Sequence, residues 1–161
     1  MDYGNATVAG IPATLINRLQ FVLNAAARSI AGLRRSARIT DTLASSRWLR
    51  ASERIQFKLA VIVCRALHGI APPYLPDLLR RVADLSSRRR LRSSLTDRLD
   101  VRPTRLVTVG DRSFSTAGPT LWNSLLNDIT SAPSLPVFRR QLKTPVSAII
   151  PRHCYCAIVV A

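Results

Sequence analysis

The sequence is poor in acidic residues, and this shortage limits the chemistry it can perform. It holds 9 Asp and Glu against 24 Lys and Arg, its only glutamate is Glu53, and no two aspartates are adjacent. A two-metal polymerase centre needs clustered carboxylates to hold its ions. The sequence therefore predicts no polymerase active site.

Histidine and cysteine are scarce as well, at two and three residues. Cys64 and His68 are four residues apart and would share a helix face, where a catalytic dyad or part of a metal site is conceivable, but a structural pair is the favoured interpretation. The tail residues His153, Cys154 and Cys156 match no standard zinc spacing, and glycine-rich phosphate loops are absent. We expect no catalytic residue, no metal and no cofactor, and hence no enzyme.

Long apolar runs are missing too. The longest, residues 59–63 and 157–161, are far shorter than the about 20 residues that a membrane-spanning helix needs. Asp2 and the lack of a basic N-terminal region argue against a secretory signal, and an odd number of cysteines does not suggest a disulfide framework. We expect an intracellular protein of the nucleus or cytoplasm, neither secreted nor in a membrane.

Positive charge is what the sequence has in excess. The net charge is +15 and the pI about 11.6, and all basic residues except Lys58 and Lys143 are arginines. The planar guanidinium pairs bidentately with phosphate, so RNA or DNA is the favoured partner. A GC-rich coding sequence would also raise the arginine content, without any binding.

Apolar spacing predicts a mainly α fold, with a small helical bundle in the first half of the chain. The first helix, between residues 12 and 33, should end near Gly32, and its apolar face comprises Leu15, Leu19, Val22, Ala26, Ile30 and Leu33. After a short helical turn, a second helix should be capped by Ser52 and end at Gly69. We expect the two helices to pack together, followed by a short third helix from Pro76.

The second half of the chain is expected to be less regular. An Arg-rich loop should separate a module at 1–85 from one at 99–144, with a boundary segment at 86–98 and a disordered tail at 145–161. The later module should hold a short β-hairpin from Leu99 to a turn at Gly110, then two short helices, one opening at Pro119 and one following Ser134 and ending at Pro145.

The candidate phosphate ligands are basic residues on helix faces and in the Arg-rich loop. We expect contacts from Arg54, Lys58, Arg65, Arg80, Arg81, Arg88, Arg89, Arg90, Arg92, Arg139 and Arg140. The alternative for any such run is an ordinary solvated helix face. The nine aromatic residues mostly fall on apolar faces, which favours roles in the core over stacking on bases.

Five blocks of residues carry a family resemblance when taken in order. They lie within residues 2–34, 48–59, 67–79, 89–94 and 109–144, and they include Leu67-His-Gly-Ile-Ala-Pro-Pro-Tyr-Leu75, Val109-Gly-Asp-Arg112 and Leu121-Trp-Asn-Ser-Leu125. In this order they resemble the region downstream of the reverse-transcriptase domain in LINE-type, non-LTR retrotransposon polyproteins. The resemblance covers about residues 2–144 and stops before the tail.

The resemblance implies a non-catalytic piece of an RNA-directed DNA polymerase, from its thumb-adjacent and C-terminal part. Such a piece is expected to help hold template RNA or target DNA, and other domains of the polyprotein are further expected partners. The family's catalytic aspartates and its endonuclease have no counterparts here. The alternatives are a module that docks on acidic partners or on neighbouring polyprotein domains, and a non-functional, decayed reading frame.

Overall fold

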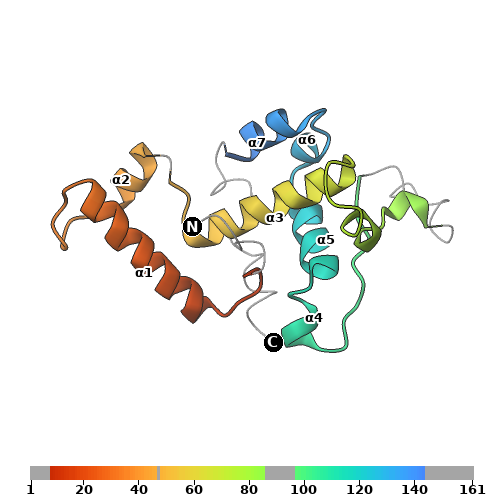
Figure 1. Ribbon diagram of the computed structural model, residues 1–161, viewed down its shortest axis with the longest axis horizontal. Helices are drawn as coiled ribbons and strands as arrows, with labels where there is room; N and C mark the ends of the chain where they lie inside the picture. The colour runs from red at the N-terminus through yellow and green to blue at the C-terminus, as the bar shows by residue number, and fades with distance from the viewer. Residues whose placement is uncertain (1–7, 47, 86–96, 144–161) are drawn as a thin grey trace.

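The structure is a computed structural model, and it describes residues 8–46, 48–85 and 97–143. The chain is mainly helical, as predicted (Figure 1). Within the described residues there is no β-sheet, and the one bridge outside helices joins Arg81 to Leu99. None of the helices in these ranges combines the length and the apolar character needed to cross a membrane.

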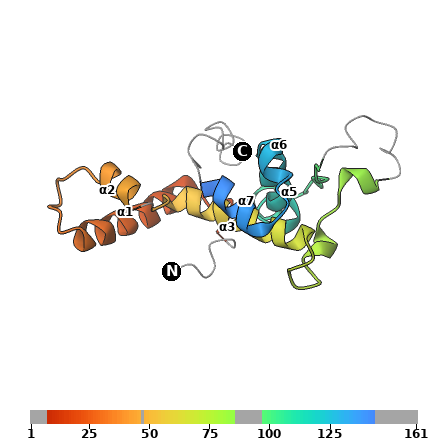
Figure 2. The ribbon, with the colours of Figure 1, turned by 90° about the horizontal axis from the view of Figure 1, so that it is seen from above.

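Two helices, α1 (Ala13–Ile30) and α2 (Thr40–Ser45), lie together at one end of the molecule in both ribbon views (Figures 1 and 2). Gly32 adopts a φ of +64° after α1, and the amide of Leu33 donates to the carbonyl of Arg28 over 3.0 Å. This is the left-handed helix end that glycine permits, and it confirms the predicted stop.

The central helix α3 (Ala51–Leu67) begins with help from α1. The Ala51 amide donates to Gln20 Oε1 over 2.7 Å, and the Arg50 amide donates to the Glu53 carboxylate over 2.9 Å. The prediction that Ser52 caps this helix is wrong, because the N-cap position is held by Arg50, two residues earlier, and the Gln20 and Glu53 side chains accept the amides of Ala51 and Arg50. The end is as predicted, with Gly69 at a φ of +69°.

The segment after α3 forms two short 3-10 turns, η1 (Pro76–Leu78) and η2 (Val82–Asp84), instead of one short helix. An antiparallel contact follows, in which the Asp100 amide donates to the Arg80 carbonyl over 2.8 Å and the Val82 amide donates to the Arg98 carbonyl over 3.0 Å. Residues 98–100 therefore lie antiparallel to residues 80–82.

The predicted β-hairpin is wrong within the described residues. Its first strand residue, Leu99, pairs with Arg81 and is only 2% exposed, whereas Val109 lies in the helical turn α4 (Val107–Gly110) and is 67% exposed. The Thr104 hydroxyl donates to the Asp111 carboxylate over 2.7 Å. The hydrogen bond between Thr104 and Asp111 joins the two ends of this loop. Leu99 is buried elsewhere, so the strand pairing that the β-branched composition suggested does not form.

Helix α5 (Phe114–Ser124) begins five residues before Pro119, so the predicted start at that proline is wrong. Ser113 stands at the N-cap position, where its carbonyl accepts the Ala117 amide over 2.8 Å. Proline inside a helix removes one hydrogen bond and crowds the preceding turn. Burial of Pro119, which is less than 2% exposed, offsets that cost.

The last described helices are α6 (Asn127–Thr130) and α7 (Leu135–Lys143). The start of α7 after Ser134 is as predicted, because the Phe138 amide donates to the Ser134 carbonyl over 2.9 Å. The predicted stop at Pro145 and the tail at 145–161 lie outside the described residues.

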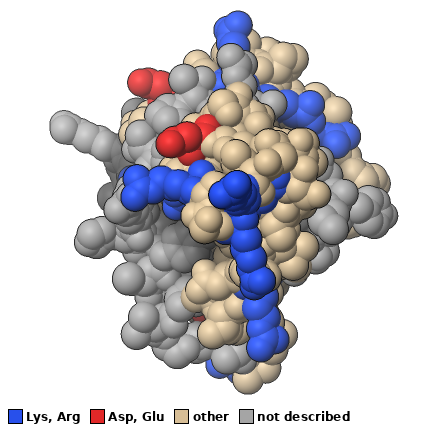
Figure 3. Space-filling view, turned by 90° about the vertical axis from the view of Figure 1, so that its left-hand side faces the viewer, with Lys and Arg blue, Asp and Glu red and all other residues tan. Residues whose placement is uncertain are grey.

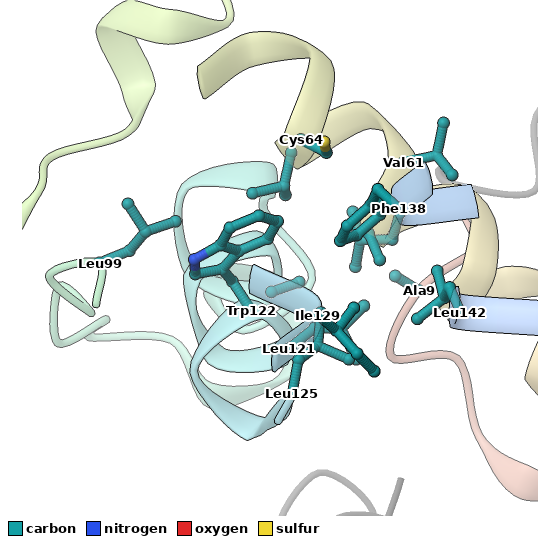
Figure 4. Close-up of a cluster of buried hydrophobic side chains, with 14 of the residues drawn as sticks. Ala9, Val61, Cys64, Leu99, Leu121, Trp122, Leu125, Ile129, Phe138 and Leu142 are labelled. Carbon is teal, nitrogen blue, oxygen red and sulfur yellow. The ribbon is translucent and has the colours of Figure 1, made fainter. Parts of the chain in front are cut away.

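One hydrophobic core joins elements from both halves of the chain (Figure 4). Phe138 and Val63 are fully buried in it, and the rings of Trp122 and Phe138 stack with centroids 5.7 Å apart. Helix α5 approaches α3 closely at Gly118, where a Cβ atom would lie 3.1 Å from Val63 Cγ2. The proposed division at 86–98 stays a prediction, but the core includes residues on either side of it.

The first helix contributes little to this core. The structure confirms contact between α1 and α3, and Ile16 lines a small apolar cavity with Ile55 and Leu121. Only Ala27 of α1 is buried, however, and the apolar face predicted to pack stays exposed, with Leu19 at 44% and Ile30 at 76%. The helix meets its neighbours through an adjacent face.

Candidate nucleic-acid interface

Three of the predicted ligands lie along one side of α3. Arg54, Lys58 and Arg65 are separated by four and seven residues, a spacing that keeps them on one helix face over about 16 Å. Arg65 is exposed, whereas Arg54 and Lys58 are half-buried and engaged in interactions within the protein. The stripe is therefore anchored at its start and open to solvent near its end.

Helix α7, which contacts α3, carries two more of the predicted arginines. Arg139 and Arg140 are exposed, while Phe138 and Leu142 of the same helix are buried against the core. The ribbon views place α7 alongside α3 (Figures 1 and 2), and the two helices are in contact. Alternation of buried and exposed positions on α7 thus holds its cations at the surface.

The positive charge of Arg139 on α7 acts on one side chain of α3, the thiol of Cys64. Burial raises the pKa of Cys64, and the positive charge of Arg139 acts on it in the opposite direction with a smaller effect. Cys64 directly precedes Arg65. We call the set Arg54, Lys58, Arg65, Arg139 and Arg140 the α3–α7 basic surface.

The other predicted ligands do not join this surface. Arg80 and Arg81 are exposed, but they lie on the connection between η1 and η2, where backbone bonds tie them to residues 98–100. Arg88, Arg89, Arg90 and Arg92 lie outside the described residues. The structure therefore gathers five of the eleven predicted residues on one pair of helices.

A second basic region is absent from the predicted set. Arg34, Arg35 and Arg38 are exposed in the connection between α1 and α2. Figure 3, seen from the α1–α2 end, shows Lys and Arg side chains recurring along this face with few Asp or Glu. Three arginines within five positions after a helix stop are the sequence signal, but the same position suits cations that cap the helix.

The Cys64–His68 pair forms as its spacing predicts, with Sγ and Nδ1 3.6 Å apart. The same Nδ1 lies 2.8 Å from the Cys64 carbonyl oxygen, so a proton on Nδ1 would be donated to that carbonyl. Such an imidazole nitrogen is not available as a base for the thiol. Within the described ranges, no three His, Cys, Asp or Glu side chains gather to hold a metal ion. These contacts favour the structural interpretation.

Comparison of the chain with protein-family models, with curated proteins and with solved structures finds no match.

Proposed function

We propose that this protein is a non-catalytic nucleic-acid-binding fragment that contacts RNA or DNA phosphates through the α3–α7 basic surface. The observation that carries the proposal is the position of exposed Arg65 and Arg139 on two helices that share one core. Cations fixed on packed helices lose less freedom on binding than cations on loops.

Charge supports the same partner. A net charge of +15 attracts polyanions over several ångströms and makes association depend on salt. Arginine forks pair with phosphate oxygens whatever the base sequence. We therefore propose binding that follows the phosphate backbone, with little discrimination between sequences.

The family resemblance supports a more specific role. The proposed parent is a LINE-type retrotransposon polyprotein, in which this region follows the reverse-transcriptase domain. The fragment would then hold RNA or target DNA for a polymerase centre located elsewhere in the polyprotein. Its own contribution is positioning of the nucleic acid.

The test is fluorescence anisotropy of the full chain with a labelled 20-nucleotide RNA hairpin and a DNA oligonucleotide of equal length, at several salt concentrations. The double variant Arg65→Gln, Arg139→Gln should bind about tenfold more weakly at low salt. The slope of log affinity against log salt should become shallower by about one to two. Each phosphate contact that the variant no longer makes is one that no longer releases a counterion.

A matched control separates this surface from net charge alone. Arg102→Gln, Arg105→Gln removes the same charge from two exposed arginines in the loop before α4, and it should change affinity by about twofold or less. Equal losses in the two double variants would overturn the assignment to α3 and α7. Absence of salt-sensitive binding by the unchanged protein would overturn the function itself.

A further inference from the structure

The segment that joins α1 to α2, residues 31–39, carries three arginines, and we call it the α1–α2 connection. Arg34, Arg35 and Arg38 are exposed, and no hydrogen bond or ion pair joins their side chains to any described part of the chain. Residues 3–40 contain no acidic residue. Asp41 follows in the first turn of α2, where the helix dipole favours a carboxylate. The three cations are therefore available to an external anion.

Hydrogen bonds hold the backbone of the α1–α2 connection. Gly32 reverses the chain at a φ of +64°, and the Ala37 amide then donates to the Arg34 carbonyl over 3.0 Å, which closes a turn. The Ala37 carbonyl in its turn accepts Nε of Arg28 from the last turn of α1, over 3.4 Å. Cations on a turn that is already ordered lose less freedom on binding than cations on an extended chain.

The end of α1 does not depend on these arginines as caps. The Arg28 carbonyl accepts the Leu33 amide over 3.0 Å, and the Ser29 carbonyl accepts the Gly32 amide over 3.4 Å. Backbone donors of this kind satisfy carbonyls at a helix end that side chains would otherwise have to serve. The guanidinium groups of the connection are thus left for a ligand.

The composition of the connection favours a nucleic acid over a membrane. Its cations are all arginines, whose planar forks pair with phosphate oxygens. Ser36, exposed between Arg35 and Arg38, adds a hydroxyl that can donate to the same oxygens. A loop that enters a membrane presents large apolar side chains, whereas Ile39 is half-buried and Leu33 is 37% exposed.

The connection lies at a distance from the α3–α7 basic surface. Helices α1 and α3 meet where Gln20 accepts the Ala51 amide, and in both ribbon views they extend from there in different directions (Figures 1 and 2). From this contact α1 continues for about 15 Å to Ile30, and α3 for about 21 Å to Arg65, at about 1.5 Å per residue. The path along the two axes is thus about 36 Å, which is one turn of duplex DNA.

We propose that the α1–α2 connection is a second phosphate-binding site, which contacts the same nucleic acid molecule as the α3–α7 basic surface. The inference rests on the proposed function, since it needs a nucleic acid on α3 and α7. Two sites on one folded chain raise the effective concentration of the ligand at each other. A duplex long enough to reach both sites therefore binds more tightly than a shorter one.

The experiment compares two DNA hairpins closed by the same loop, with stems of 6 and 20 base pairs. At about 3.4 Å per pair the stems are about 20 Å and about 68 Å long, so only the longer one reaches both sites. Arg34→Gln, Arg35→Gln, Arg38→Gln should weaken binding of the longer hairpin by about tenfold or more at low salt. Its salt slope should become shallower by about two to three. Binding of the shorter hairpin should change by about threefold or less.

The matched control removes three positive charges elsewhere. Arg98, Arg102 and Arg105 are exposed in the segment before α4, and their joint replacement by glutamine should change the affinity for either hairpin by about threefold or less. Equal effects of the two triple variants on the longer hairpin would overturn the proposal. An equal loss on both hairpins in the variant of the connection would also overturn it, because the two sites would then not share one molecule.

The shorter hairpin keeps this inference separate from the proposed function. Arg65→Gln, Arg139→Gln should weaken its binding, and that loss, together with a variant of the connection that behaves like its control, would keep the function and overturn the second site. Absence of salt-sensitive binding by the unchanged protein would remove the function, and the second site with it. On vesicles with about 30% phosphatidylserine, both triple variants should reduce retention equally. A larger loss in the variant of the connection, with DNA binding unchanged, would replace the nucleic acid with a membrane.

Discussion

Asn123 holds Leu99 by both polar groups of its backbone. The side-chain oxygen of Asn123 accepts the Leu99 amide over 2.9 Å, and its Nδ2 donates to the Leu99 carbonyl over 2.8 Å. Two residues earlier, the Asp97 carbonyl accepts the indole N–H of Trp122 over 2.9 Å. Helix α5 therefore fixes the backbone of Asp97 and Leu99, the first described residues after position 96.

Replacing Asn123 with alanine should lower the free energy of unfolding by about 2 kcal/mol, because the two backbone groups of a buried residue lose their partners. Urea denaturation followed by circular dichroism measures the change. Asn127→Ala serves as the control, since this residue is exposed at the start of α6, and it should cost about 0.5 kcal/mol or less. Equal effects at both positions would contradict the role given to Asn123.

Phe138→Ala should destabilise the protein by about 3–5 kcal/mol, since it leaves a cavity in the core and removes the ring stacked on Trp122. The milder Phe138→Leu should cost about 1–2 kcal/mol and keep the fold measurable. Thermal melting monitored by tryptophan fluorescence reports both changes. Phe21→Ala, in an exposed phenylalanine, should leave the melting temperature nearly unchanged.

Gln20→Ala should destabilise the protein by about 1 kcal/mol, since the first amide of α3 would lose its acceptor. Gln20→Glu keeps an acceptor oxygen and adds negative charge at a helix N-terminus, so it should restore most of that stability. Chemical denaturation at pH 7 compares the two variants. If glutamate were as damaging as alanine, the contact between Gln20 and Ala51 would not be the reason.

The Cys64 thiol should be unreactive at neutral pH, because burial raises its pKa and disfavours the thiolate. Cys154→Ser, Cys156→Ser leaves Cys64 as the only thiol, and its alkylation by iodoacetamide at pH 7.5 should be at least about tenfold slower than that of N-acetylcysteine. Addition of urea should restore the rate. Fast alkylation in the folded protein would instead favour the catalytic interpretation of Cys64 and His68.

The raised pKa of Cys64 also determines the direction in which the free energy of unfolding changes with pH. A folded pKa above the unfolded value means that the thiol's contribution to stability is complete at neutral pH. It is lost as pH rises above the ordinary thiol value of about 8.5 and through the raised folded pKa. The unfolding free energy of the Cys154→Ser, Cys156→Ser variant should therefore fall at high pH, and Cys64→Ala should remove that part of the fall.

Local signals in the sequence were enough for helix ends and helix faces. Gly32 and Gly69 end their helices as predicted, because a left-handed residue after a helix is a local requirement that glycine meets. The start of α7 after Ser134 is a local feature of the same kind. The basic face of α3 also follows from spacing alone, because side chains seven residues apart must lie on one side of a helix.

Long-range contacts explain what the sequence could not reveal. Ser52 is a good cap by composition, but Gln20, more than 30 residues away, provides the acceptor for Ala51. Leu99 belongs to an alternating pattern typical of strands. Its backbone is instead hydrogen-bonded by Asn123, and its side chain packs in the core. The approach of Arg139 to α3 depends on how α7 packs, and no local pattern encodes that arrangement.

The shared core has a consequence for how the chain could be divided. Helix α3 comes from before residues 86–96, and helices α5, α6 and α7 come from after them. A cut within that segment would leave two pieces whose buried surfaces complete each other, Val63 in one and Phe138 in the other. We therefore expect fragment complementation, in which two separately produced halves regain the fold when they are mixed.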